Sequence, residues 1–371
     1  METSKVYFTD FRCRLGDGQQ QKLRRLLLRA GMDKIDFQDK FVAIKMHFGE
    51  LGNLAYLRPN YAKTVADLVK ELGGRPFLTD CNTLYVGSRK HALEHIDTAY
   101  TNGFSPFSTG CHVIIADGLK GSDEAEVPVE GAQYCPTAKI GRALMDADIV
   151  ISLTHFKGHE EAGFGGTLKN LGMGGGSRAG KMEMHSDGKP SVNHELCVGC
   201  GACSRICAHD APVITNKKCT IDHDRCVGCG RCLALCPKDA IEPSLDAKAE
   251  ILNAKIAEYS KAVCAGRPNF HISIVRDVSP NCDCHSENDA PIVPDVGMFA
   301  SFDPVALDVA CADAVNRQPV LAHSQLAEAC AHSEDPDHFR HVHPNTDWRT
   351  AIAHGVKIGL GRDHYELISV K

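Results

Sequence analysis

The sequence of 371 residues lacks long apolar runs and is poor in aromatic residues, with a single tryptophan. No stretch approaches the roughly 18 apolar residues that a membrane-spanning helix needs, so no membrane association is expected. The first residues do not combine a basic segment with a long apolar one, which predicts no secretory signal and a cytoplasmic location. An excess of positive charge is also lacking, because the sequence has 41 Lys and Arg residues and 47 Asp and Glu residues. Phosphate binding needs a concentrated basic face, so nucleic acid is not an expected partner.

Cysteine, by contrast, is abundant, with 18 residues. Disulfide frameworks are typical of small secreted domains that cannot build a sufficient core. A chain of this length with 43% hydrophobic residues can bury an ordinary core, which excludes wholesale disorder as well. The spacing of the cysteines therefore indicates metal binding rather than disulfides.

Eight of the cysteines lie in two copies of C-x2-C-x2-C-x3-C, offset by 29 residues. This is the spacing of bacterial ferredoxins, in which the fourth cysteine of each copy binds the other cluster. The sequence thus predicts two [4Fe-4S] clusters; structural zinc is the alternative, although zinc sites seldom carry three evenly spaced cysteines plus a fourth. The predicted ligand sets are Cys197, Cys200, Cys203 and Cys236 for one cluster, and Cys226, Cys229, Cys232 and Cys207 for the other.

Short apolar strands alternate with amphipathic helices on both sides of the cysteine-rich block. This alternation predicts an α/β fold with a mostly parallel sheet covered by helices on both faces. We expect one discontinuous α/β body (1–190 and 244–371) with an inserted small α+β ferredoxin-like domain (191–243); two independent α/β domains are the alternative. Expected strands are 5–8, 41–48, 76–79, 112–116, 149–153, 270–275 and 365–370, and expected helices are 20–30, 61–72, 91–100, 140–146, 246–265, 304–315 and 348–357.

Polar residues follow several of these strands. Ligands of parallel α/β sheets bind beyond the carboxyl ends of the strands, so these residues are candidates for a site. Histidines beside a lysine in that position suit acid–base catalysis or metal ligation, and loop histidines bonded to backbone are the alternative. The candidate catalytic residues are His47, Glu50, Asn82, His155, Lys157, His159 and Lys169.

A glycine-rich stretch, residues 163–181, carries interleaved basic residues. Glycine allows positive φ and close backbone approach, so N–H groups here could line a nest for an anionic small molecule; a flexible hinge is the alternative. Met182 stands where a Walker A motif has Ser or Thr, and no G-x-G-x-x-G is present to hold a nicotinamide or flavin. The expected anion- or cofactor-binding residues are Gly165, Gly166, Gly174, Gly175, Arg178 and Lys181.

Cys282 and Cys284, followed by His285, form a compact donor set for a soft metal or a third redox centre. Their single intervening residue is shorter than usual zinc spacing, and a structural turn with paired thiols is the alternative. Asp303 and a following proline are typical of a helix start, and Asp308 on that helix could face the cleft.

Six motifs occur in order along the α/β body: Lys45-Met-His47-Phe-Gly-Glu50, Thr79-Asp80-Cys81-Asn82-Thr83, His155-Phe-Lys157-Gly-His159, Gly163-Phe-Gly-Gly-Thr-Leu-Lys169-Asn170, Asn281-Cys282-Asp283-Cys284-His285 and Ser301-Phe-Asp303-Pro304. Together they resemble the domain-of-unknown-function 362 family. The resemblance implies an iron–sulfur protein, usually of anaerobic metabolism and often with a ferredoxin insertion, and it implies no established reaction. The fourth motif is also similar to the glycine-rich lysine loop of nickel-dependent lactate racemases.

The sequence supports three hypotheses about function. The first is a cytoplasmic oxidoreductase whose clusters relay electrons to or from a site at the sheet edge, with a small-molecule substrate and a redox partner protein. The second is a non-enzymatic electron-transfer or assembly subunit of a larger redox complex. The third is a racemase-like protein that binds a further metal or an anion, with structural clusters.

Overall fold

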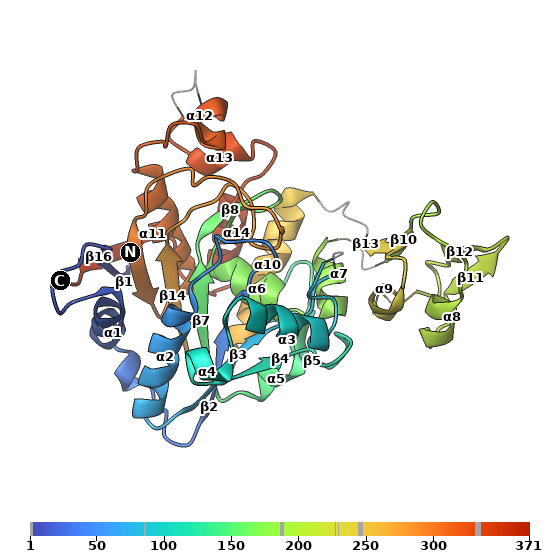
Figure 1. Cartoon of the computed structure of the whole chain (residues 1–371), viewed down its shortest axis with the longest axis horizontal. Helices are drawn as coiled ribbons and strands as arrows, with labels where there is room; N and C mark the ends of the chain where they lie inside the picture. The colour runs from blue at the N-terminus through green and yellow to red at the C-terminus, as the bar shows by residue number, and fades with distance from the viewer. Residues whose placement is uncertain are drawn as a thin grey trace.

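The computed structural model describes residues 3–84, 87–185, 189–226, 228, 230–243, 248–330 and 335–371. Its centre is an eight-stranded sheet in the order β16-β1-β15-β14-β7-β2-β3-β4 (Figure 1). β15 runs antiparallel to both its neighbours, and the remaining neighbouring pairs are parallel. The predicted mostly parallel sheet is therefore confirmed. Its strands are β1 (Ser4–Thr9), β2 (Phe41–Lys45), β3 (Arg75–Asp80), β4 (His112–Ile115), β7 (Ile149–His155), β14 (Asn269–Val275), β15 (Gly297–Ser301) and β16 (Tyr365–Ser369).

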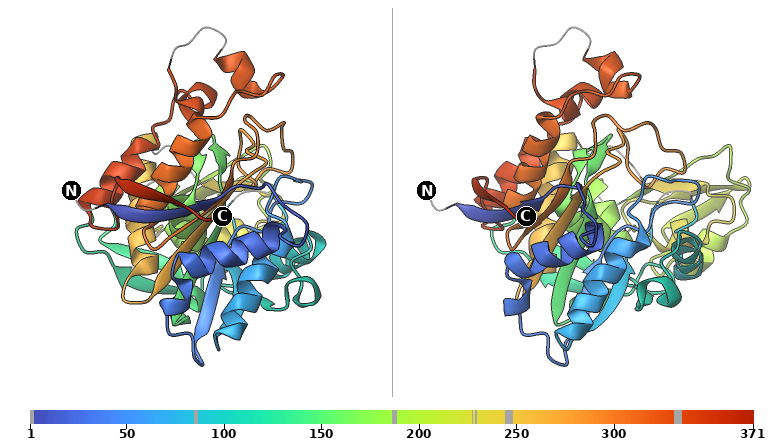
Figure 2. Two further views of the ribbon diagram at one scale, coloured as in Figure 1. Left: turned by 90° about the vertical axis from the view of Figure 1, so that its left-hand side faces the viewer. Right: turned by 60° about the vertical axis from the view of Figure 1, so that its left-hand side comes forward.

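Helices cover both faces of the sheet, as predicted, because successive side chains of a buried strand point to opposite faces. In β2, Val42 and Ile44 belong to one hydrophobic core and Ala43 to the other. Figure 2 shows the blue helices on one side of the sheet and the orange and red helices on the other. The first core includes α1 (Gln19–Arg29) and α2 (Pro59–Glu71), and the second includes α6 (Thr167–Gly175), α10 (Ala249–Cys264), α11 (Pro304–Asn316) and α14 (Arg349–Lys357).

The remaining elements of the body are helices and strand pairs that lie between the strands and helices already named. The sequence did not predict the hairpins formed by residues 124–141 and 157–165. The helix expected over 140–146 begins only at Arg142, because Ile140 lies in the second strand of the first hairpin. Residues 246 and 247 of the helix expected over 246–265 lie outside the described residues. These elements are η1 (Met32–Lys34), α3 (Ala92–Thr101), α4 (Pro106–Thr109), β5 (Glu124–Pro128), β6 (Thr137–Gly141), α5 (Arg142–Asp146), β8 (Lys157–His159), β9 (Gly163–Gly165), α7 (Arg178–His185), α12 (Gln325–Ala329) and α13 (His338–Val342).

The cysteine-rich segment forms a lobe at one end of the molecule, on the right in Figure 1. Its end strands β10 (Pro190–Val192) and β13 (Ile241–Pro243) pair with each other, so the chain enters and leaves the lobe at adjacent points. Between them lie α8 (Ala202–Ile206), the paired strands β11 (Pro212–Thr215) and β12 (Lys218–Ile221), and α9 (Arg231–Leu235). The two short helices keep the 29-residue offset of the cysteine motifs, so the sequence repeat is also a structural repeat.

Candidate functional site

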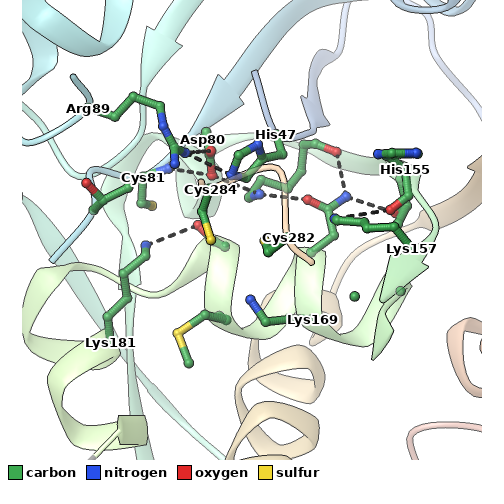
Figure 3. Close-up of a pocket in the computed structure, with 18 residues that line it drawn as sticks. His47, Asp80, Cys81, Arg89, His155, Lys157, Lys169, Lys181, Cys282 and Cys284 are labelled. Carbon is green, nitrogen blue, oxygen red and sulfur yellow. Dashed lines mark hydrogen bonds and ion pairs between the residues drawn. The ribbon is translucent and has the colours of Figure 1, made fainter. Parts of the chain in front are cut away.

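The carboxyl ends of β2, β3 and β7 border a cavity of about 70 Å³ (Figure 3). Helices α6 and α7 and the connection between β14 and β15 complete its wall. Five of the side chains that line it carry an ammonium or guanidinium group, namely Lys45, Arg89, Lys157, Lys169 and Lys181. The cavity thus lies where α/β sheets hold their ligands, and its lining is rich in positive charge.

Most of the site residues expected from the sequence for the α/β body line this cavity. They are His47, His155, Lys157, Gly165, Gly166, Lys169, Gly174, Lys181, Cys282 and Cys284. Glu50, Asn82, His159, Gly175 and Arg178 are not among its lining residues. Lys45, Asp80, Arg89 and Asn170 also line the cavity, although they were not among the candidate site residues. A charged residue at the end of an apolar strand, as in β2, is a signal that could have found Lys45.

Asn82 and Gly175 lie beside the cavity and not in its lining, and their expected contact with substrate or cofactor stays a prediction. The side-chain amide of Asn82 donates to Asp117 Oδ1 (2.8 Å) and to Gly118 O (2.9 Å), so it is engaged beside β4. Gly175 faces apolar side chains, because a Cβ at this position would lie 2.9 Å from Val263 and 3.0 Å from Leu144. Both positions therefore support packing next to the cavity.

Lys45 and Asp80 form a buried ion pair in the cavity wall, with side chains 1% and 4% exposed and 3.0 Å between Nζ and Oδ1. Lys45 Nζ also donates to Asn170 Oδ1 at 2.8 Å, which ties β2 to α6. Burial lowers the pKa of Lys45. Burial by itself raises the pKa of Asp80, but Lys45 and His95 outweigh it and hold that pKa well below its ordinary value.

Arg89 joins Glu50 and His47. Its Nε donates to Glu50 Oε2 at 3.0 Å, and its Nη1 lies 2.9 Å from His47 Nε2. Burial and the charge of Arg89 lower the pKa of His47 to about 3, so the imidazole is neutral near pH 7. Burial raises the pKa of Glu50, but Arg89 and Ser88 outweigh it and leave that pKa lowered. Glu50 is thus an ionised carboxylate that orients Arg89.

His155 holds the buried Asp283 in place. Its Nδ1 lies 2.9 Å from Asp283 Oδ2, and its Nε2 lies 2.8 Å from Arg276 O. Both ring nitrogens thus face oxygen atoms, and the imidazole positions Asp283 in the cavity wall; its expected catalytic role stays a prediction. Burial raises the pKa of Asp283, but His155 and Lys157 outweigh it and lower the pKa to about 2.

Cys282, Cys284 and His159 form a compact cluster of donor atoms, all within 4.8 Å of one another. A second such group combines Cys284 with Glu160 and His285. Cys282 is 4% exposed, and both thiols line the cavity. These Cys and His groups could hold a metal ion.

Lys169 differs from the other lysines of the cavity. Lys45 and Lys157 have carboxylate partners, and Lys181 Nζ donates to Gly176 O at 2.6 Å. Within the described part of the chain, the ammonium of Lys169 has no hydrogen-bond or ion-pair partner, and the side chain points into the cavity (Figure 3). It is therefore the cation best placed to meet a bound molecule.

The glycine-rich stretch forms helices α6 and α7, which corrects the expected loop with an anion nest. Within 163–181 only Gly163 has a positive φ, whereas a nest requires left-handed residues. The glycines instead permit close packing: a Cβ on Gly172 would overlap Ile256 O in α10, and one on Gly174 would overlap Lys45 Nζ. Close approach, rather than backbone freedom, explains the glycine content here.

The lobe contains two small cavities of about 20 Å³ each, and cysteines of both repeats line each of them. Cys229 lies outside the described residues. In each cavity, the described cysteines among the first three of one repeat lie together with the fourth cysteine of the other repeat. Thiolates in this arrangement fit an iron–sulfur cluster. One cavity is lined by Cys197, Cys200, Cys203, Cys236 and Cys219, and the other by Cys207, Cys226 and Cys232.

Helix α7 contacts both the cavity and the lobe. Lys181 lines the cavity, and its neighbour Met182 packs in the hydrophobic core of the lobe. The Arg178 side chain approaches the second cysteine motif, since a Cβ on Gly230 would lie 2.7 Å from Arg178 Cγ and 3.1 Å from Met182 Sδ. Arg178 is therefore buried between the body and the lobe and does not line the cavity, and its expected contact with a cofactor stays a prediction.

Comparisons with known proteins place these features in a wider setting. A thylakoid-associated protein from Synechocystis sp. is 29% identical over 126 residues, which are 32% of this chain and 33% of that protein. The match therefore covers about a third of the curated relative. Among the described residues, no helix combines the length and apolar character needed to cross a membrane.

Two solved structures resemble this chain in part, each at a TM-score of 0.40. The lactate racemase apoprotein from Thermoanaerobacterium thermosaccharolyticum is 10% identical, with 74% of this chain and 51% of that chain covered. A protein from Thermotoga maritima is 14% identical, with coverage of 79% and 57%. The chain thus spans little more than half of either protein. Residues 42–313 match the family model described as domain of unknown function DUF362, so this chain belongs to the DUF362 family.

Proposed function

We propose that this protein is an iron–sulfur oxidoreductase in which two [4Fe-4S] clusters exchange electrons with a small anionic molecule bound in the cavity at the sheet edge. In this proposal residues 191–243 are the inserted cluster domain, and residues 1–190 and 244–371 are the body. The observation that carries it is the position of α7, whose adjacent residues Lys181 and Met182 contact the cavity and the lobe core. A single helix thus separates the two centres.

The two cysteine sets carry the cluster part of the proposal. Each would supply four thiolates, and the bound clusters would supply one-electron redox chemistry. Cys219 lies against the first set but outside the motif, because its N–H donates to Cys197 Sγ at 3.3 Å and its own Sγ lies 3.5 Å from Cys203 Sγ. Burial raises the pKa of Cys219 to about 12, so it is a neutral thiol that packs beside the ligands.

The charge of the cavity supports an anionic ligand. Lys169 points into it without a partner among the described residues. Arg89 Nη2 is buried and, in the same part of the chain, has no hydrogen-bond partner. A buried polar group without a partner is costly, and an anion would complete the hydrogen bonding of both cations. Phosphate and carboxylate groups have this chemistry.

Iron content and two matched cysteine variants test the cluster assignment. Anaerobically purified protein should contain about eight iron atoms per chain, Cys203→Ala about four, and Cys219→Ala about eight. Equal iron loss in both variants would show that burial rather than ligation matters at Cys203. Zinc in place of iron in the native protein would refute the proposed redox function.

The ligand assignment has a separate test. Native protein denatured under anaerobic conditions should release a small anion, which mass spectrometry detects. The Lys169→Met variant should release at least about tenfold less of this anion, because a charged hydrogen bond contributes roughly 1.5–3 kcal/mol. The matched control is Lys139→Met, because Lys139 lies outside the cavity wall and pairs with Glu183. Release of the same amount from Lys169→Met and native protein would contradict this assignment.

A further inference from the structure

The segment between β14 and β15 directs two thiols into the cavity. Asp283, which separates them in sequence, is fully buried and is fixed by His155 at 2.9 Å, and its carbonyl accepts from Glu50 N–H at 2.9 Å. The backbone then turns, with His285 N–H donating to Cys282 O at 3.1 Å. Cys282 and Cys284 both line the cavity on either side of this anchored residue.

His159 decides between a metal and a redox role for these thiols. Its Nδ1 accepts from the backbone N–H groups of Glu161 (3.1 Å) and Ala162 (3.3 Å). A neutral imidazole with an accepting Nδ1 carries its proton on Nε2. A histidine that binds metal through one nitrogen ordinarily donates a hydrogen bond from the other, which the two N–H donors here exclude. His159 is thus arranged to donate to sulfur rather than to bind a metal.

We infer that Cys282 and Cys284 are a redox-active pair that interconverts between dithiol and disulfide in the cavity wall. In the reductive direction the Sγ–Sγ bond breaks, two electrons and one proton are taken up, and the products are the Cys282 thiolate and the Cys284 thiol. For the electrons the inference rests on the proposed function: each of two reduced clusters supplies one and is itself oxidised. The proton comes from solvent.

The surroundings stabilise the reduced state in this form. The hydrogen bond from Cys284 lowers the pKa of Cys282 well below its ordinary value, and Lys169, Lys157 and His159 lower it further. The same hydrogen bond raises the pKa of Cys284. The pair therefore holds one negative charge beside two lysines, which is the environment of reactive cysteines.

Other buried thiols of the body lack this environment. The Cys81 thiol also lines the cavity, but its Sγ donates to Gly175 O at 3.4 Å, and burial raises its pKa. Burial also raises the pKa of Cys311, which packs in the core. These two serve as internal controls in the same chain.

The test is a thiol–disulfide titration of anaerobically purified holoprotein against mixtures of oxidised and reduced dithiothreitol. Samples are quenched in acid, alkylated after denaturation and analysed by peptide mass spectrometry. In the reduced state the peptide with Cys282 and Cys284 should carry two alkyl groups. In the oxidised state it should carry none and be two hydrogens lighter than the unmodified dithiol peptide. Cys81 and Cys311 should stay reduced, and Cys282→Ser should abolish the change.

The Lys169→Met variant tests the electrostatic part. Stabilisation of the thiolate makes a disulfide more oxidising, so loss of Lys169 should shift the midpoint toward more reducing mixtures by roughly tenfold in the ratio of reduced to oxidised reagent. A merely structural lysine would leave this midpoint unchanged. An unshifted midpoint would overturn the role of Lys169.

Two outcomes would overturn the redox pair itself. One is full alkylation of both cysteines at every ratio of reagent. The other is a stoichiometric metal ion, in addition to the cluster iron, that native protein contains and Cys282→Ser lacks. If this metal also prevents oxidation of the thiols in native protein, the thiols belong to a metal site. The titration needs no clusters, so a normal titration with iron content far below about eight would refute the proposed function and leave the thiol pair standing.

Discussion

Replacement of Lys45 by methionine should test how much the buried charges of the site depend on one another. Two unit charges 3.0 Å apart, as in the Lys45–Asp80 pair, attract by about 5.5 kcal/mol at an effective dielectric constant of about 20. Desolvation offsets much of that gain, but loss of one partner leaves the other charge buried. Lys45→Met should therefore lower the free energy of unfolding by about 3–5 kcal/mol.

The structure also predicts which compensation would follow. Asp80 has one further cationic neighbour, Arg89 at 3.9 Å, which is too distant for a direct hydrogen bond. His95 lies 3.8 Å away, but burial lowers its pKa to about 3, so it is neutral near pH 7. Asp80→Asn in the Lys45→Met background removes the unpaired charge, so the double variant should be more stable than the sum of the two single changes predicts, by about 2 kcal/mol.

Urea unfolding of anaerobically purified protein, followed by far-UV circular dichroism, measures all four members of this cycle. A free energy of unfolding for Lys45→Met within about 0.5 kcal/mol of the native value, the range of ordinary surface changes, would show that the ion pair does not support the fold. Additive effects of the two changes would show that the pair contributes no coupling. Iron content of each variant, measured in parallel, separates loss of the body fold from loss of clusters.

Three further predictions concern elements that position the cavity. Burial lowers the pKa of His271 to about 3. As the pH falls from about 6.5 toward about 3, the unfolded chain therefore binds a proton at this residue that the folded chain does not bind. The free energy of unfolding should then fall by up to about 1.4 kcal/mol per pH unit because of His271. The difference in unfolding free energy between native protein and His271→Gln should shrink from pH 7 to pH 5, and parallel curves would contradict this. Asp308 accepts from the N–H groups of Thr167 (2.6 Å) and Leu168 (2.9 Å) at the start of α6, so Asp308→Ala should cost roughly 2–3 kcal/mol in urea unfolding, and an unchanged midpoint would show that α6 needs no cap. A Cβ on Gly172 would overlap Ile256 O and lie 2.8 Å from Ser260 Oγ, so Gly172→Ala should destabilise the contact of α6 with α10 by about 1–3 kcal/mol, which hydrogen exchange of the α6 amides would detect.

The elements that sequence predicted well are those whose pattern depends on near neighbours. Buried strands such as β7, Ile149–His155, read as continuous apolar runs. The cysteine spacing likewise predicted which residues of the two repeats line the same small cavity, including Cys236 with the first repeat. The strand signal lies within a few residues along the chain, whereas the placement of Cys236 follows from the repetition of a short motif.

The elements that were missed depend on distant partners. Glycine opposes helix formation by about 1 kcal/mol per residue, so the helices α6 and α7 follow from their packing against α10 and β2 and not from local propensity. The ion pairs of Lys45 with Asp80 and of Arg89 with Glu50 join residues far apart in sequence. The sequence left open whether Asp308 faces the cleft, and the structure shows that it is fully buried and caps α6.

The charge balance of the cavity links its two proposed properties. Lys45 is matched by Asp80, Arg89 by Glu50 and Lys157 by Asp283. Lys181 donates to the backbone carbonyl of Gly176, so no carboxylate balances Lys181 or Lys169 among the described residues, and the Cys282 thiolate or an anion would balance Lys169. Oxidation of the thiol pair would remove the thiolate charge, and an anion would then bind more tightly to the oxidised protein. Because coupling between two equilibria is reciprocal, a bound anion should in turn make the disulfide harder to reduce. The occupancy of the cavity would thereby control whether electrons from the lobe reach the thiols or the bound molecule.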